Sequence, residues 1–187
     1  TAKQGHLSPC FSIVEMLNVI YKEEMVFDAE NYDDENNDTC IVSKGHAGLA
    51  IYALLLDMGI LSEEEFFSFA KFDSILGEHP DRNKVPTVKA STGSLGHGLP
   101  IAVGMATGYI SKKMRNRVFV IMGDGEANEG AVWEAALMAD RLNLYNLVCI
   151  VDNNHSESFS PYLADKFKAF GWDVTVVDDG NNVNALR

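Results

Sequence analysis

The apolar positions of the chain follow a helical spacing in its first third and form continuous runs in its second half. Apolar residues three and four positions apart follow Ser8-Pro9, which predicts a helix that begins there and runs to about Met25. The residues from Asp28 to Asp38 are rich in acids and lack apolar periodicity, so we expect a solvated loop. Residues 47–58 are apolar almost all round and stop at Gly59, which indicates a buried helix.

A capping box and a long irregular segment come next. Ser62 and Glu65 predict the start of a short helix. We expect its apolar face to consist of Phe66, Phe67, Phe69 and Phe72. The segment from Gly77 to Gly98 has no periodicity and contains two histidines. Loops longer than about 12–15 residues inside compact domains usually carry function, so this segment is a candidate site. From Leu99 the chain is rich in small residues, which favours a helix packed closely against a neighbour.

The second half predicts buried strands separated by helices. Val118–Met122 is an apolar run that enters Gly123-Asp124-Gly125, and Leu147–Val151 is another, closed by Asp152-Asn153-Asn154. The helix between them makes a right-handed βαβ unit with parallel strands. We expect its inward residues to be Val132, Ala135, Ala136, Met138, Ala139 and Leu142. A helix near 163–170 and a third strand over 172–177 follow. The predicted fold class is α/β, a three-layer parallel sheet flanked by helices.

Length and charge narrow the class of protein. The 187 residues, of which 47% are hydrophobic, suffice for one domain spanning residues 1–187. A net charge of -12 disfavours binding to nucleic acid and to anionic membrane surfaces. No apolar run reaches the ~18 residues of a membrane span, and three separated cysteines form no disulfide or zinc pattern. We therefore expect a cytoplasmic protein in which any phosphate ligand is accompanied by a cation.

Polar residues follow both predicted strands of the βαβ unit. Ligands of open parallel sheets bind outside the carboxyl ends of the strands, where Asp124 and Asn154 would face one point. Two hard oxygen ligands with room for phosphate oxygens favour a Mg²⁺ or Ca²⁺ site. The alternatives are that these residues only cap turns, or that the glycine turn binds a dinucleotide. The glycine spacing does not fit the dinucleotide pattern, and Glu126 and Glu129 add negative charge to the same turn.

The histidines share a setting beside glycine or at the edges of elements. Glycine lets backbone and ligand approach closely, and no pair has metal-ligand spacing. We therefore interpret them as donors to phosphate and hydroxyl groups rather than as a metal cluster. They are His6, His46, His79, His97 and His155.

Taken together, the motifs resemble the N-terminal, diphosphate-binding domain of thiamine-diphosphate enzymes of the transketolase type. Gly123-Asp124-Gly125 and Asn153-Asn154, with 27 residues between Gly125 and Asn153, are similar to the family's cofactor motif. The other blocks that agree in order are Gly5-His6, 43–46, 77–81, 91–96 and 163–167. The resemblance covers nearly the whole chain and is closest to the N-terminal subunit of a split, two-chain transketolase.

The resemblance implies a set of site residues. Metal ligands would be Asp124, Asn154 and the backbone carbonyl of Ser156. The cofactor, thiamine diphosphate with Mg²⁺ or Ca²⁺, would contact His46, Gly93, Ser94, Leu95, Gly123, Asp124, Gly125, Glu126 and Asn154. The catalytic set would be His6 and His79, which hydrogen-bond substrate hydroxyls, and Glu129, which links to the partner's catalytic glutamate.

The same resemblance implies an activity and a partner. A transferase of this type moves a two-carbon ketol unit from a ketose or ketose-phosphate donor to an aldose acceptor. The activating glutamate and the pyrimidine pocket would lie on a separate pyrimidine-binding subunit, so the chain would be inactive alone and assemble as a heterotetramer. Alternatives are half of a 2-oxo-acid dehydrogenase, half of a deoxyxylulose-phosphate-synthase-like enzyme, a nucleotide-binding module or a non-catalytic scaffold.

Several positions depart from the family pattern. Residues 7–10 are bulkier than the family's small residues, which predicts a different donor pocket. His97 stands where glutamine is common and His155 where glycine is common. Eight residues separate Asn154 from Leu163, fewer than the family usually has.

Overall fold

The sheet is parallel and has three strands in the order β1-β2-β3. In this computed structural model, which describes residues 5–154 and 162–187, they are β1 Thr39–Val42, β2 Val118–Gly123 and β3 Leu147–Asp152. Pairing starts with Thr39 opposite Val118 and Val118 opposite Leu147, so the carboxyl ends of all three strands lie at one edge. Five of the six residues of β2 are buried, as expected for a central strand covered on both faces.

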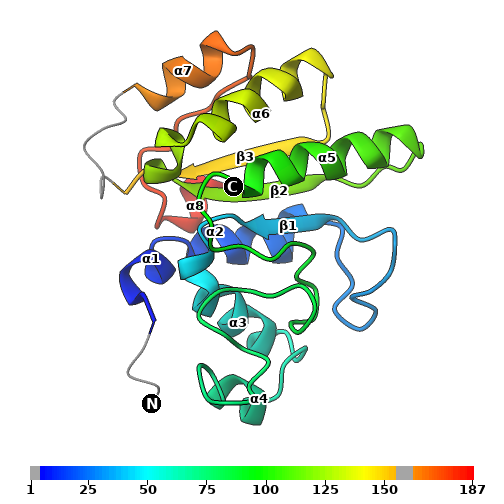
Figure 1. The fold of residues 1–187 in the computed structure, drawn as a ribbon, viewed down its shortest axis with the longest axis vertical. Helices are drawn as coiled ribbons and strands as arrows, with labels where there is room; N and C mark the ends of the chain where they lie inside the picture. Colours follow the sequence, from blue (N-terminus) through cyan, green and yellow to red (C-terminus); the bar gives the residue numbers. More distant parts are fainter. Residues whose placement is uncertain (1–4, 155–161) are drawn as a thin grey trace.

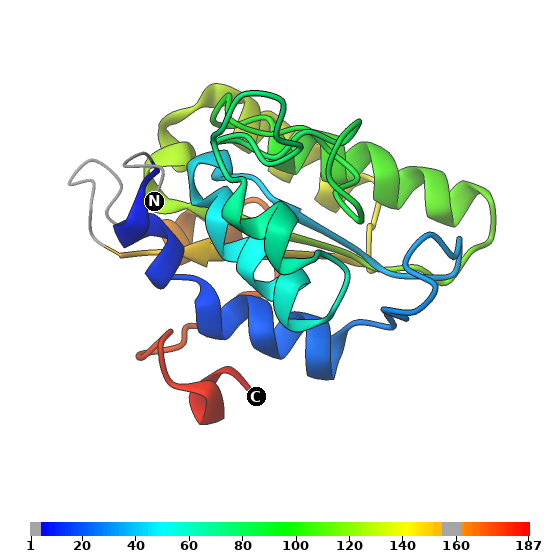
Figure 2. The same cartoon turned by 90° about the horizontal axis from the view of Figure 1, so that it is seen from below.

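Helices cover both faces of the sheet (Figures 1 and 2). On one face lie α1 Leu7–Phe11, α2 Val14–Val19, the π-helical turn Ile20–Glu24 and α3 Gly48–Asp57. On the other lie α5 Gly98–Ser111, α6 Gly130–Arg141 and α7 Leu163–Ala169. The remaining helices are the short α4 Glu63–Phe67, α8 Val183–Leu186 and the 3-10 turns Gly45–Ala47 and Asp124–Asn128. The predicted three-layer α/β class is confirmed.

The alternation of β2 divides the core into two clusters. Phe119 and Ile121 join the cluster formed with α1, α2 and α3, whereas Val118, Val120 and Met122 join the one formed with α5, α6 and α7. Successive strand residues point to opposite faces, so one apolar run serves both layers. This burial fixes the register of β2 and therefore the position of Asp124 just after the end of the strand.

The prediction of one continuous helix up to about Met25 is wrong. It breaks between α1 and α2, where Ile13 leaves helical geometry with φ -124° and ψ 3°. The Ser12 hydroxyl lies 2.9 Å from the Pro9 carbonyl oxygen and donates to Asp152 Oδ2 at 2.6 Å. These contacts hold the break, which the apolar periodicity alone does not reveal.

The observed strands differ from the expected ones in two ways. The sequence pattern does not predict β1, because this strand has only four residues and follows an acidic loop. The third strand predicted at 172–177 is wrong, because those residues form no strand. Trp172 and Val174 instead pack against the core cluster of α5–α7, and the Trp172 indole donates to the Ala136 carbonyl at 3.0 Å. Side-chain packing thus replaces strand pairing there.

Some predicted apolar faces are only partly buried. Phe69 is buried and Phe66 packs against the core, but Phe67 is 65% exposed and Phe72 is 96% exposed. The reason is that α4 ends at Phe67 and the chain then turns, with Ala70 at a positive φ of 56°. Of the predicted inward residues, Met138 on α6 and Leu142 just after it are 45% and 44% exposed, while Val132, Ala135, Ala136 and Ala139 are buried.

The capping box at Ser62 and Glu65 starts α4, and residues 77–97 form the predicted irregular segment. Residues 28–38 are irregular as well, but Asn37 and Asp38 are buried, so this loop is only partly solvated. Among residues 5–154 and 162–187, no helix combines the length and the apolar character needed to cross a bilayer.

Candidate functional site

The candidate site lies at the carboxyl ends of the three strands. Ser43 follows β1, Asp124 follows β2, and Asn154 stands two residues after the end of β3. Gly123 and Asp152 are paired across β2 and β3, so the residues that follow them leave the sheet side by side. The predicted meeting of the two strand-end loops is therefore present in the fold.

Asp124 begins the 3-10 turn Asp124–Asn128 and is only 2% exposed. Its Oδ1 accepts a hydrogen bond from the Gly125 amide at 2.9 Å. A buried carboxylate is costly unless it is compensated, which favours a cation or hydrogen-bond donors at this position. Asp124 thus has the burial and the chemistry of a metal ligand.

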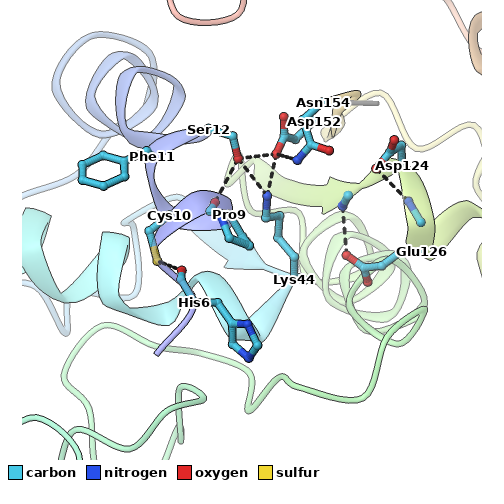
Figure 3. Close-up of polar contacts among 12 residues, drawn as sticks. His6, Pro9, Cys10, Phe11, Ser12, Lys44, Asp124, Glu126, Asp152 and Asn154 are labelled. Atoms are coloured by element: carbon cyan, nitrogen blue, oxygen red, sulfur yellow. Dashed lines mark hydrogen bonds and ion pairs between the residues drawn. The ribbon is translucent and has the colours of Figure 1, made fainter. Parts of the chain in front are cut away.

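Asn154 is held by its neighbour Asp152. Its amide Nδ2 donates to Asp152 Oδ2 at 3.1 Å, and its amide oxygen points away from Asp152, to the side where Asp124 lies (Figure 3). A carboxylate and an amide oxygen form a donor set that fits a hard divalent cation. Among the described residues, no three His, Cys, Asp or Glu side chains gather as a metal-binding group. The third predicted ligand, Ser156, lies outside the described residues.

Glu126 is 2% exposed, and both of its carboxylate oxygens accept hydrogen bonds from the protein. Oε1 accepts from the Ser43 hydroxyl at 2.5 Å and from the Gly96 amide at 3.0 Å, and Oε2 accepts from the Gly123 amide at 3.0 Å. The side chain therefore ties together the ends of β1 and β2 and the loop before α5. The resemblance places Glu126 among the cofactor contacts.

Three of the predicted histidines come together. The His6 and His46 rings lie edge to face with centroids 5.6 Å apart. The pKa of His46 is lowered, first by burial and then by the positive charges of Lys44, His6 and His79. His46 is thus held in the neutral form, which has one N–H donor and one acceptor nitrogen. His6 Nε2 also lies 3.3 Å from Glu78 Oε1.

His79 and the loop that contains Gly93, Ser94 and Leu95 are packed closely together. A Cβ on Gly93, whose φ is +138°, would lie 3.0 Å from the His79 ring, so a side chain there would press on the histidine. A Cβ on Gly45 would lie 2.5 Å from the Gly93 amide nitrogen. The loop is therefore stacked on the turn that carries His46. Ser94 and Leu95 are exposed on it.

Glu129 lies at the other side of the same loop. It is the exposed residue before α6, and a Cβ on Gly96, at φ +80°, would lie 2.5 Å from its Cβ. His97 is exposed at the start of α5 and makes no capping hydrogen bond with its side chain. His155 lies outside the described residues.

The sequence alone assigns no role to Lys44 or Asp152. Both are buried, at 1% and 4% exposure, and Lys44 Nζ lies 2.5 Å from Asp152 Oδ2 (Figure 3). Lys44 stands in the block 43–46 that contains His46, but the sequence does not show that its partner lies 108 residues away. A lysine between a buried strand and a buried helix is the signal that could have indicated an ion pair.

These features define an α/β domain in which a buried carboxylate, an amide and the turn that carries His46 follow the carboxyl ends of adjacent parallel strands. The family model described as transketolase, thiamine diphosphate binding domain, matches residues 1–187. The chain belongs to this family.

Relatives named as transketolases resemble this chain in sequence and in fold. The chain is 39% identical over 97% of its length to transketolase-like protein 2 of Homo sapiens, of which it covers 30%. It is 35% identical over its whole length to one of the subunits of apulose-4-phosphate transketolase from Phocaeicola vulgatus, of which it covers 69%. The transketolase structure from Leishmania mexicana superposes with a TM-score of 0.83 at 26% identity, over 96% of this chain and 32% of that one. The chain thus spans about a third of some relatives and about two thirds of others.

Proposed function

We propose that this chain is the diphosphate-binding subunit of a transketolase-like enzyme that binds thiamine diphosphate with Mg²⁺. The observation that carries the proposal is that Asp124 and Asn154 follow two paired parallel strands, while His46, which packs against His6, lies in the turn after β1 at the same edge of the sheet. Hard oxygen ligands and hydrogen-bond donors in one place suit a divalent cation with a diphosphate and a polyhydroxylated substrate.

In this proposal each site residue has its own role. Asp124 and Asn154 would hold the cation, which offsets the repulsion between a diphosphate and a chain of net charge -12. Neutral His46 would donate its N–H to a phosphate oxygen. His6 and His79 would bind substrate hydroxyls and move protons at the oxygen atoms where negative charge develops. Thiamine diphosphate, when bound, supplies the chemistry that breaks and forms the carbon–carbon bond.

The partner in this proposal is a pyrimidine-binding subunit of the same family, in a heterotetramer. One supporting observation is that the relatives named as transketolase subunits are covered to 69%, whereas transketolase-like protein 2 is covered to 30%. A second is that Glu129 is exposed at the start of α6, where a partner could reach it. The proposed substrates are a ketose or ketose-phosphate donor and an aldose acceptor. Relatives named for apulose-4-phosphate and for 6-deoxy-6-sulfo-D-fructose support this class of substrate.

Calorimetry and a donor assay test the proposal. We expect the full chain with its partner subunit to bind thiamine diphosphate only with Mg²⁺, and EDTA to abolish the binding. NAD and ATP should give no heat under the same conditions. Ketol transfer from a ketose, with no turnover of 2-oxo acids, would support the transketolase assignment over a 2-oxo-acid dehydrogenase or a deoxyxylulose-phosphate-synthase-like enzyme. Full activity of the chain alone, or metal-independent binding of NAD or ATP, would contradict it.

A further inference from the structure

A buried ion pair lies next to the proposed metal site and bridges two strands that are not neighbours. Lys44 follows β1 and Asp152 ends β3, with β2 between them. The two side chains are 2% and 5% exposed, and Lys44 Nζ lies 2.5 Å from Asp152 Oδ2. A Cβ on Gly123 would lie 3.9 Å from Lys44 Cδ, so the lysine side chain passes beside the end of β2, one residue before Asp124.

Asp152 Oδ2 is the point on which the surrounding donors converge. It accepts from Lys44 Nζ at 2.5 Å, from the Ser12 hydroxyl at 2.6 Å and from Asn154 Nδ2 at 3.1 Å. Lys44 Nζ also donates to the Ser12 hydroxyl oxygen at 3.1 Å (Figure 3). Charged hydrogen bonds in a buried place are strong and have defined geometry, so the carboxylate has little freedom to rotate.

The Asp152 carboxylate contacts the NH₂ group of the Asn154 amide. An amide has an oxygen that can bind a cation and an NH₂ group that repels one. Because Asp152 takes the NH₂ group, the oxygen is on the opposite side, facing the region of Asp124 (Figure 3). If Asp152 could turn, the amide could rotate and present N–H groups to the cation.

We propose that Lys44 and Asp152 are positioning residues that orient the Asn154 amide for metal binding. The proposal rests on the proposed function, since it concerns the same cation. A gain in stability does not by itself account for the ion pair, because a buried ion pair is weak evidence for stability. The proposal gives the pair a role in orienting a metal ligand. Partners that orient a metal ligand typically change metal affinity about 10–100-fold when they are replaced.

The test uses the full chain with its partner subunit and the double variant Lys44→Met/Asp152→Asn. This variant removes both charges together, which avoids leaving one buried charge without its partner. We expect the Mg²⁺ concentration at half-saturation, measured calorimetrically at fixed thiamine diphosphate, to rise about 10–100-fold. The metal-free melting temperature is the second readout, and it should stay near that of the parent. Ser12→Ala keeps both charges and removes one donor, so we expect a smaller rise of the same midpoint.

The matched control is the exposed ion pair of Lys22 and Asp57, whose charged atoms are 2.7 Å apart. Lys22→Met/Asp57→Asn removes the same charges far from the strand ends and should leave the Mg²⁺ midpoint unchanged. A raised midpoint in the double variant or in Ser12→Ala, with this control at the parent value, supports the proposal. An unchanged midpoint in every folded variant overturns it and leaves the proposed function intact. A parent protein that shows no Mg²⁺-dependent binding at all contradicts the proposed function itself, and the positioning role with it.

Discussion

The Ser43 hydroxyl donates to the Glu126 carboxylate at 2.5 Å and thereby joins the end of β1 to the turn after β2. The same carboxylate accepts the Gly96 and Gly123 amides, so three segments of the candidate site converge on one buried side chain. In this arrangement Glu126 determines the shape of the site through the backbone around it.

Glu126→Gln tests this role. The amide has nearly the same shape, but its NH₂ group cannot accept a hydrogen bond from the groups that face it. We expect the free energy of unfolding to fall by about 1–3 kcal/mol, because a buried donor loses its acceptor. Urea denaturation of the variant and the parent measures the difference. Exposed Glu64→Gln is the control and should change stability by less than about 0.5 kcal/mol; an equal loss in both variants would contradict the interpretation.

Asp124→Asn tests the proposed cation site. The variant keeps the size of the side chain and one oxygen atom but removes the negative charge that attracts a divalent cation. We expect the midpoint of the Mg²⁺ titration at fixed thiamine diphosphate to rise by at least about tenfold, the lower end of the range for replacing an orienting partner.

The control for this variant is Asp33→Asn, a surface carboxylate that is 78% exposed in its side chain and lies 3.5 Å from Lys89. It changes net charge by the same amount and should leave the titration unchanged. Parent-like metal dependence in Asp124→Asn would mean that Asp124 does not bind the cation.

Gly45→Ala tests the close packing of the histidine turn and the loop around Gly93. The new methyl group would lie 2.5 Å from the Gly93 amide nitrogen, so the backbone of one segment must move. We expect a loss of about 1–3 kcal/mol of stability. Gly104→Ala is the matched control within α5, where no atom lies within 4 Å of the new methyl group.

In that control, alanine should raise the free energy of unfolding by about 0.5–1 kcal/mol, because it lowers the entropy lost by a helical residue on folding. We expect denaturation of both variants side by side to show changes of opposite sign in the free energy of unfolding. A neutral Gly45→Ala would show that the loop can shift without cost.

His46 makes stability depend on pH. Its pKa is lowered from the ordinary value of 6.5 in the folded chain, chiefly by burial. Below that value the unfolded chain binds a proton that the folded chain resists, so protons favour unfolding. We therefore expect the contribution of His46 to reduce stability as the pH falls below about 6.5 and to vanish above it. Denaturation of the parent and His46→Gln at pH 5 and pH 8 tests this: the variant should lose less stability on acidification, and equal losses would contradict it.

The sequence predicts best where apolar periodicity and glycine turns agree. The runs that form β2 and β3 are continuous and end in glycine or in Asp and Asn, and the long loop 77–97 stands out because it lacks any period. The grouping of Asp124 with Asn154 follows from the topology of a parallel sheet alone. For the same reason the general location of the candidate site could be predicted without knowing any contact.

What could not be predicted depends on contacts between distant residues. Ser12, at the break in the first helix, donates its hydroxyl to Asp152, and Trp172 donates to a carbonyl of α6 rather than joining a strand ladder. Lys44 looks like an ordinary polar position until the fold brings Asp152 to it, and the contact of Glu126 with Ser43 joins residues 83 positions apart. Short β1 has too few residues to show a period.

The break between α1 and α2 has a mechanical consequence for the site. Ser12 fastens the N-terminal segment to the end of β3 through Asp152, and the Cys10 thiol, two residues earlier, donates to the His6 carbonyl at 2.9 Å. His6 and Asn154, which stand near opposite ends of the sequence, are thus coupled through a short chain of contacts (Figure 3). The spacing between the group that would meet the sugar and the group that would meet the cation therefore depends on a helix break as well as on the sheet.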